Sequence, residues 1–207
     1  NSALTLGTEL GVLAIFKPKV ADYQRAIKNI FLANVDPDLQ LALLSKMRNP
    51  RLVGLDSMNY WIDHKKRSLL KLMKRVDIYV ANDAEARTLS GEIHLLKAAK
   101  CLRRMGPPII IIKKGEHGVL VYSDDLIFSL PAYPVEKVVD PTGAGDTFAG
   151  GFMGYLTSVK KITGRALKKA VTYGIVMASF NVEGFGVERS SKVTLRDIEA
   201  RRKLFHQ

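Results

Sequence analysis

Short apolar runs alternate with amphipathic stretches along most of the chain, and this rhythm restricts the possible folds more than any other feature. Four of the runs are strand-sized and lie at residues 30–34, 52–55, 76–80 and 109–112. The amphipathic stretches between them have helical spacing, which is the pattern of parallel strands joined by helical crossovers. The sequence therefore predicts an α/β fold with a mainly parallel sheet.

Local signals mark the ends of several predicted helices. Asp36-Pro37-Asp38 opens a helix that is predicted to reach Met47, with Pro50 ending it. Gly91 is predicted to stop a helix over residues 84–89, as glycine commonly does at a helix C-terminus. Further helices are predicted around residues 69–73, over 95–105, 147–156 and 164–181, and from Thr194 onward.

The segment after the fourth apolar run changes character. Residues 118–122 and 126–130 flank the turn-like residues 123–125, and this spacing predicts an antiparallel hairpin at one edge of the sheet. A further strand is predicted at residues 135–139, directly before a glycine-rich turn.

Composition excludes several classes of protein. The chain has 207 residues, of which 47% are hydrophobic and 25% charged, so it is not disordered, collagenous or a repeat array. Its longest pure apolar run, at residues 109–112, is far shorter than the roughly 20 residues that span a bilayer, and no membrane partner is expected. The single cysteine, Cys101, and the absence of a signal-peptide pattern in residues 1–13 predict a cytoplasmic protein.

The charge balance favours anionic ligands. Lys and Arg number 32 against 20 Asp and Glu, a net charge of +12, which attracts phosphates and nucleotides. The basic residues occur in short clusters without interleaved aromatics, a pattern typical of solvated helix faces, and nucleic-acid binding is therefore not favoured. The four histidines share no ligand spacing, so no zinc site is expected.

The segment Gly143-Ala144-Gly145-Asp146 lies between a predicted strand and a predicted helix. Glycines permit a positive φ and close backbone approach, and a helix N-terminus carries about half a positive charge, so this turn can form an anion hole. Asp146 would repel a bound phosphate unless it accepts a proton from an attacking hydroxyl. The alternative is that Asp146 only caps the helix, and the residues alone leave both interpretations open.

Residues 140–153, Asp140-Pro-Thr-Gly-Ala-Gly-Asp146-Thr-Phe-Ala-Gly-Gly151-Phe-Met, match position for position the C-terminal signature of the ribokinase-like (PfkB) carbohydrate kinases. Residues 77–91 resemble the family's strand and Asn-x-x-Glu segment, and residues 113–118 resemble its nucleotide loop. The resemblance implies a three-layer α/β/α fold and an ATP-dependent kinase acting on a sugar hydroxyl. A nucleoside kinase of the same family and a non-catalytic nucleotide-binding or regulatory domain are the alternatives.

The resemblance also implies roles for individual residues. Asp146 would be the general base beside an anion hole formed by Gly143, Ala144 and Gly145. Asn82 and Glu85 would organise Mg²⁺ and its waters, while Lys113, Gly115 and Gly118 would lie near the phosphates or ribose of MgATP. The residues themselves leave two structural alternatives open. Asn82 and Glu85 also match the pattern of a helix N-terminus, and Lys113 and Lys114 also match a pair of exposed charged residues at the end of a strand.

A second ion is implied by the resemblance, because many relatives bind a monovalent cation such as K⁺ beside the anion hole. Here the ligands would come from Asp140, Thr142 and residues 181–186. Asp140 could equally cap its own turn, as Asp before Pro often does. Asp56 and Asn59 follow a predicted strand, where they would either face the active site or cap the next helix.

Part of the family pattern is not recognisable in this chain. Relatives usually begin with a strand, a Gly-Gly motif and a small β lid that contacts the acceptor sugar. Residues 1–16 resemble the tail of that lid, and residues 17–207 resemble the α/β nucleotide-binding and catalytic domain, about the C-terminal two-thirds of a member. A small-molecule sugar or nucleoside and ATP are the expected partners, and a homodimer could form through the lid.

Overall fold

A six-stranded mixed sheet organises the fold in the computed structural model, which describes residue 7 and residues 9–205. The strand order follows the chain: β1 (Asn29–Leu32), β2 (Leu52–Asp56), β3 (Ile78–Asn82), β4 (Ile109–Lys113), β5 (Val119–Tyr122) and β6 (Ile127–Leu130). β1 to β4 are parallel, whereas β5 and β6 form an antiparallel hairpin at the edge. The predicted mainly parallel sheet and its edge hairpin are confirmed.

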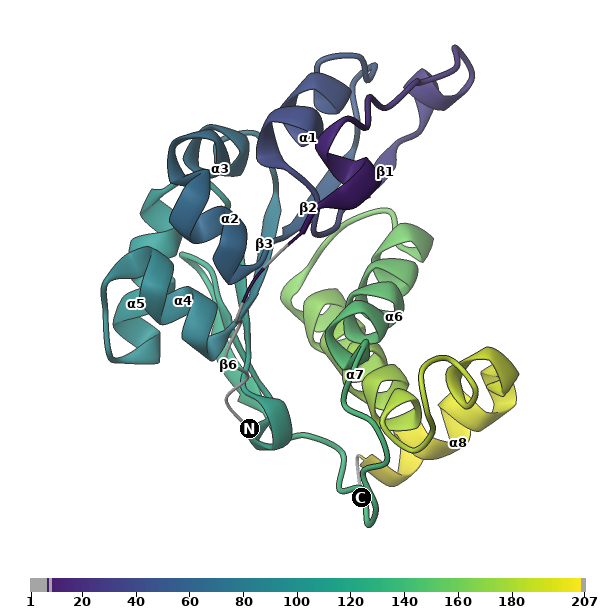
Figure 1. Ribbon diagram of the computed structural model, residues 1–207. Helices are drawn as coiled ribbons and strands as arrows, with labels where there is room; N and C mark the ends of the chain where they lie inside the picture. The colour runs from purple at the N-terminus through teal and green to yellow at the C-terminus, as the bar shows by residue number, and fades with distance from the viewer. Residues whose placement is uncertain (1–6, 8, 206–207) are drawn as a thin grey trace.

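Helices cover both faces of this sheet (Figure 1). One layer holds α1 (Pro37–Leu44), α2 (Asn59–His64), α3 (Lys66–Met73), α4 (Asp83–Ser90) and α5 (Leu95–Arg104). The opposite layer holds α6 (Ala144–Ser158) and α7 (Gly164–Asn181), with α8 (Leu195–Phe205) packed beside α7. Short 3₁₀ turns occur at Gly11–Ala14, Gln24–Ala26, Gly115–His117 and Ser190–Lys192. This is the three-layer α/β/α arrangement that the sequence predicts.

Alternation along the central strands decides which side chains face which layer. In β4, Ile110 and Ile112 pack against the α1–α5 layer, whereas Ile111 packs against α6 and α7. Both faces are covered, which explains why these strands are apolar without a break. Because side chains alternate, Lys113 falls on the same face as Ile111 and is directed toward α6.

α6 and α7 approach each other closely through two glycines. A β-carbon on Gly174 would lie 2.7 Å from the ring of Phe148, and one on Gly151 would lie 2.8 Å from the carbonyl oxygen of Tyr173. Real β-carbons do not approach other atoms this closely, so both positions require glycine. The contact fixes the direction in which the N-terminus of α6 points.

The strand predicted at residues 135–139 is not formed, and the sheet ends at β6. Pro131 and Pro134 cannot donate to a strand ladder. Val138 and Val139 are exposed, and the backbone N–H of Val139 donates to the carbonyl of Val182, next to the end of α7, at 2.7 Å. The apolar run therefore leads the chain across to α7 instead of extending the sheet.

The first predicted helix is shorter than expected. α1 ends at Leu44 rather than near Met47, and Asn49 turns the chain with a positive φ of 49°. Pro50 therefore lies beyond the helix, two residues before the start of β2. No helix among the described residues is long and apolar enough to cross a membrane.

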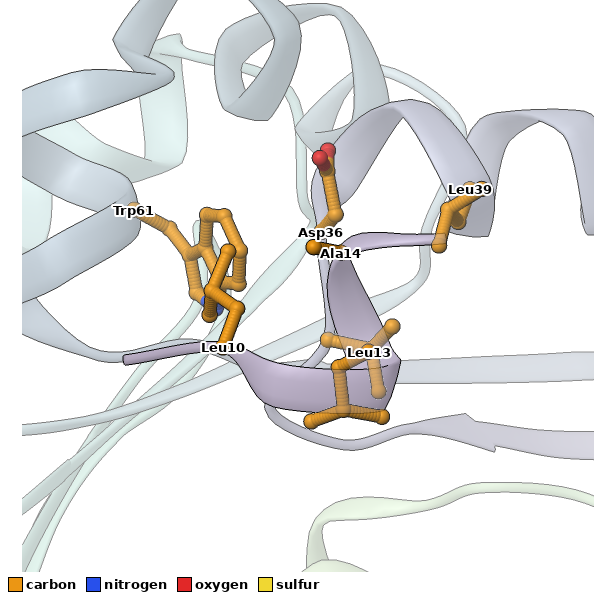
Figure 2. Close-up of a pocket in the computed structure, with 7 residues that line it drawn as sticks. Leu10, Leu13, Ala14, Asp36, Leu39 and Trp61 are labelled. Carbon is orange, nitrogen blue, oxygen red and sulfur yellow. The ribbon is translucent and has the colours of Figure 1, made fainter. Parts of the chain in front are cut away.

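The N-terminal segment lies against the start of α1. Of the predicted lid remnant at residues 1–16, residues 1–6 and 8 lie outside the described residues, and Gly11–Ala14 form a 3₁₀ turn. A pocket of about 150 Å³ opens between this turn, α1 and Trp61 (Figure 2). The indole N–H of Trp61 donates to Asn34 Oδ1 at 2.7 Å, which ties α2 to the end of β1. Assignment to a lid stays a prediction.

Candidate active site

Polar side chains gather where the parallel strands end. The register pairs Asp56 of β2 with Val80, and Asn82 of β3 with Lys113 of β4, so all three polar residues reach the same edge of the sheet. In open α/β sheets, ligands bind outside this carboxyl edge. Residues that are distant in the sequence are thereby brought to one place.

The N-terminus of α6 meets this edge. Gly143 occupies the N-cap position with a φ of 79° and without a side-chain cap, and Asp146 follows in the first turn with an exposed side chain. Asp146 is therefore not the N-cap. Among the described residues, the backbone N–H groups of Gly145 and Asp146 have no hydrogen-bond acceptor. Such unpaired first-turn donors, with the helix dipole, are suited to bind an anion.

Asn181, the last residue of α7, holds the glycine turn in place through two side-chain hydrogen bonds. Its side-chain Nδ2 donates to the carbonyl of Thr142 at 2.8 Å, and its Oδ1 accepts from Thr147 Oγ1 at 2.9 Å. Only 2% of the residue is exposed. Sequence reasoning placed Asn181 in a candidate cation loop and missed this support, because nothing in the local pattern links it to residues 142–147.

Lys113 and Asp56 form a largely buried ion pair at the same edge. Lys113 Nζ lies 3.0 Å from Asp56 Oδ2, with side-chain exposures of 18% and 11%. A β-carbon on Gly145 would lie 2.9 Å from Lys113 Nζ, so the ammonium group rests against the first turn of α6. The alternative that Lys113 is an exposed strand-end charge is therefore wrong, whereas Lys114 points elsewhere and binds Ser129 Oγ at 3.1 Å.

Opposing effects act on the pKa of Asp56. Burial raises the pKa of this carboxyl group above its usual value, and the Lys113 ammonium opposes the rise. The negative charge of Asp146 raises the pKa of Asp56 further, which indicates that the two carboxylates share one neighbourhood. Asp56 does not cap α2, whose N-cap is Met58, and Asn59 is the first residue of that helix.

Asn82 and Glu85 form a capping box at the start of α4. Asn82 Oδ1 accepts from the Glu85 N–H, and Glu85 Oε2 accepts from the Asn82 N–H, both at 2.8 Å. The helix-start interpretation is thus correct for both residues. Burial raises the pKa of Glu85, which is 7% exposed, to about 7.

One oxygen of the Glu85 carboxylate is available to interact with a metal ion or its waters. Glu85 Oε1 makes no hydrogen bond to another described residue. Across residues 7 and 9–205 no group of three or more His, Cys, Asp or Glu side chains forms a closed metal cage. Mg²⁺ usually keeps several waters and takes one or two carboxylates plus substrate phosphates. A single free carboxylate oxygen fits that mode of binding and does not fit a dedicated protein cage.

The loop between β4 and β5 is shaped by two glycines with positive φ, 56° at Gly115 and 83° at Gly118. A β-carbon on Gly118 would lie 2.0 Å from the carbonyl oxygen of Leu130. The backbone N–H of Lys114 donates to the Gly118 carbonyl at 2.7 Å and closes the loop. This loop begins directly after Lys113, at the edge where the other polar residues lie.

Asp140 ties the glycine turn to the segment after α7. Its Oδ1 accepts from the Thr142 N–H at 2.9 Å and its Oδ2 from the Gly186 N–H at 3.2 Å. These donors hold the pKa of Asp140 below its usual value. The turn-capping interpretation therefore describes the geometry of Asp140.

The sequence matches a known protein family. Residues 15–194 match the profile described as pfkB family carbohydrate kinase. The chain belongs to the pfkB family of carbohydrate kinases. This pfkB-family chain is 36% identical over 156 residues to a cytidine kinase of Thermococcus kodakarensis, an alignment that covers 73% of this chain and 54% of that protein. The chain spans about half the length of the curated relatives it matches.

Solved structures share the fold of this pfkB-family chain. The nucleoside kinase of Methanocaldococcus jannaschii, described as an archaeal member of the ribokinase family, superposes with a TM-score of 0.73 and 23% identity over 94% of this chain and 60% of that one. The aminoimidazole riboside kinase of Salmonella enterica, solved with its riboside and an ATP analogue, gives a TM-score of 0.76 at 22% identity, over 86% of this chain and 63% of that one. The ribokinase-like fold is confirmed.

Proposed function

We propose that this chain is the nucleotide-binding and catalytic part of an ATP-dependent kinase that phosphorylates a hydroxyl group of a sugar or nucleoside. The observation that carries the proposal is the first turn of α6, where unpaired backbone donors lie beside the exposed carboxylate of Asp146. A domain kept only for nucleotide binding has no use for a carboxylate beside phosphate. Asp146 therefore favours a catalytic role over a regulatory one.

The reaction follows from the roles of these groups. Asp146 accepts the proton of the acceptor hydroxyl, and the oxygen of that hydroxyl forms a bond to the γ-phosphorus of ATP. The bond between the γ-phosphorus and the β–γ bridging oxygen breaks, and ADP is released. The backbone N–H groups of Gly145 and Asp146 bind the negative charge on the transferred group. Gly143, Ala144 and Gly145 shape this anion hole.

The nucleotide and its cations are assigned to groups at the same edge of the sheet. Gly115 and Gly118 keep the β4–β5 loop tight beside the nucleotide. Glu85, positioned by Asn82, holds Mg²⁺ through water. Bound Mg²⁺ supplies charge neutralisation on the phosphates. K⁺ would be held by backbone and side-chain oxygens of Asp140, Thr142 and the segment of residues 181–186.

The acceptor is assigned at the level of its class. Relatives named cytidine kinase and nucleoside kinase support a nucleoside acceptor, and relatives named deoxyribokinase support a pentose. Both acceptors present a hydroxymethyl group on a five-membered sugar ring, which is the group that Asp146 would deprotonate.

The test is ADP release from MgATP by the full chain against a panel of pentoses, hexoses and nucleosides. Asp146→Asn keeps the shape of the turn and removes the base, so turnover should nearly vanish while MgATP affinity stays similar. Asp125→Asn, which changes an exposed carboxylate in the β5–β6 turn, is the matched control and should leave both unchanged. Full turnover by Asp146→Asn, or no binding of MgATP by the unaltered chain, would contradict the proposal.

A further inference from the structure

The Lys113–Asp56 ion pair joins the ends of two strands that are not neighbours in the sheet. Lys113 ends β4 and Asp56 ends β2, and β3 lies between them. Two strand spacings amount to about 10 Å, so the lysine side chain must extend across the edge of β3 to reach its partner. The contact is therefore a specific arrangement of a long side chain rather than an incidental meeting of adjacent residues.

Stability alone does not account for this pair. Burying two charges costs desolvation free energy that their attraction seldom exceeds, so a buried ion pair is weak evidence for a stabilising role. The raised pKa of Asp56 agrees with this, because burial outweighs the effect of the ammonium group. The pair lies at the edge where the nucleotide site is proposed, which points to a role in that site.

The position of the ammonium group points to an anion. Lys113 Nζ lies against Gly145 in the first turn of α6, where the helix dipole is positive and favours negative groups over cations. The Asp56 carboxylate, 3.0 Å from Lys113 Nζ, offsets this repulsion, and the same turn carries the unpaired N–H groups of Gly145 and Asp146. Two sources of positive potential converge there, and a multiply charged phosphate would satisfy both.

We propose that Lys113 binds the terminal phosphoryl group of the nucleotide, and that Asp56 is a positioning residue that holds the Lys113 ammonium at the N-terminus of α6. This inference rests on the proposed kinase function and adds a charge-based selectivity for triphosphate over diphosphate. Lys114, one residue later, carries the same charge but binds Ser129 on the hairpin, so it takes no part in this selectivity.

The test compares MgATP and MgADP affinities of the full chain by calorimetry. Lys113→Met removes a charge-assisted contact that only the triphosphate makes, and MgATP affinity should fall about 10- to 100-fold while MgADP affinity changes less than about twofold. Lys97→Met, at an exposed lysine of α5, is the control and should change neither affinity. An equal fall for both nucleotides, or no fall for either, would overturn the inference.

Variants of Asp56 test whether this residue positions Lys113. Asp56→Ala should lower the preference for MgATP over MgADP, and Asp56→Asn, which can still accept from Lys113, should restore part of it. In the double variant Lys113→Met/Asp56→Ala the loss should equal that of Lys113→Met alone, because Asp56 acts through Lys113. Additive losses would contradict a positioning role.

The same variants separate an effect on stability from an effect on nucleotide binding. Lys113→Met leaves Asp56 buried without its partner, so Lys113→Met/Asp56→Asn provides a variant in which neither charge remains. That variant should unfold near the temperature of the unaltered chain and still bind MgATP as weakly as Lys113→Met. If the unaltered chain binds both nucleotides and Lys113→Met matches it, only this inference fails; if the unaltered chain binds neither, the proposed function fails as well.

Discussion

The side chain of Asn181 donates to the backbone carbonyl of Thr142 at 2.8 Å, and this bond joins residues 39 positions apart. The same amide accepts a hydrogen bond from Thr147, so both ends of the glycine turn are fixed to the last residue of α7. The geometry of the candidate anion hole therefore depends on how α6 and α7 pack. Local turn sequence alone does not hold it.

Replacing Asn181 should damage both stability and nucleotide binding. Asn181→Ala leaves the Thr142 carbonyl and the Thr147 hydroxyl without their partner, and the free energy of unfolding should fall by about 1–3 kcal/mol. MgATP affinity should fall as well, because the turn loses its support. Urea unfolding and calorimetric titration measure the two effects.

Two threonines of α6 provide the control for this prediction. Thr147→Val removes the hydroxyl that donates to Asn181 and should weaken MgATP binding. Thr157→Val removes an exposed hydroxyl that bonds only within its own helix, to the Gly154 carbonyl, and should not. Equal MgATP affinities for the two valine variants would show that the bond does not position the turn.

Glu85 should make stability depend on pH in a defined direction. Its folded-state pKa is raised from 4.5 to about 7 by burial, so its contribution to stability is fully present below pH 4.5 and is lost as pH rises toward 7. The loss amounts to about 3 kcal/mol. Without Mg²⁺, the unaltered chain should therefore lose about 3 kcal/mol more than Glu85→Gln between pH 4.5 and pH 8, measured by urea unfolding. Parallel profiles for the two proteins would contradict the raised pKa.

The same substitution tests the assigned role in Mg²⁺ binding. Glu85→Gln keeps the capping-box acceptor but removes the charge that attracts the hydrated cation, so a higher Mg²⁺ concentration should be needed for half-maximal ATP binding. Glu136→Gln, in the exposed loop after β6, is the control and should titrate like the unaltered chain. An unchanged Mg²⁺ titration of Glu85→Gln would remove Glu85 from the site.

Gly174 of α7 and Gly150 of α6 should respond oppositely to replacement by alanine. At Gly174 a β-carbon would meet the ring and carbonyl of Phe148 at 2.7–2.9 Å, and Gly174→Ala should cost about 1–3 kcal/mol by overpacking. At Gly150 nothing lies within 4 Å, and Gly150→Ala should stabilise α6 by up to about 1 kcal/mol through its higher helix propensity. Thermal unfolding of both variants checks the contrast, and destabilisation of equal size would refute the close approach.

Several features follow from the sequence by itself because they depend on residues within a few positions of one another. Alternating apolar runs predict the parallel strands, and residues 123–125 predict the edge hairpin. The glycines of the 143–145 segment predict a turn that leads into a helix, and Asn82 with Glu85 predicts a helix start. Each of these patterns acts locally, through backbone freedom, capping or alternation, and the structure agrees with each.

Other features were decided only by the tertiary structure. The apolar run at residues 135–139 resembles a strand, yet two prolines and contact with the end of α7 keep it out of the sheet. Lys113 has the sequence context of an exposed charge, but the order of the strands brings it to Asp56, 57 residues away. Such partners cannot be read from neighbouring residues, because the free energy of a buried charge is set by whatever the fold places around it.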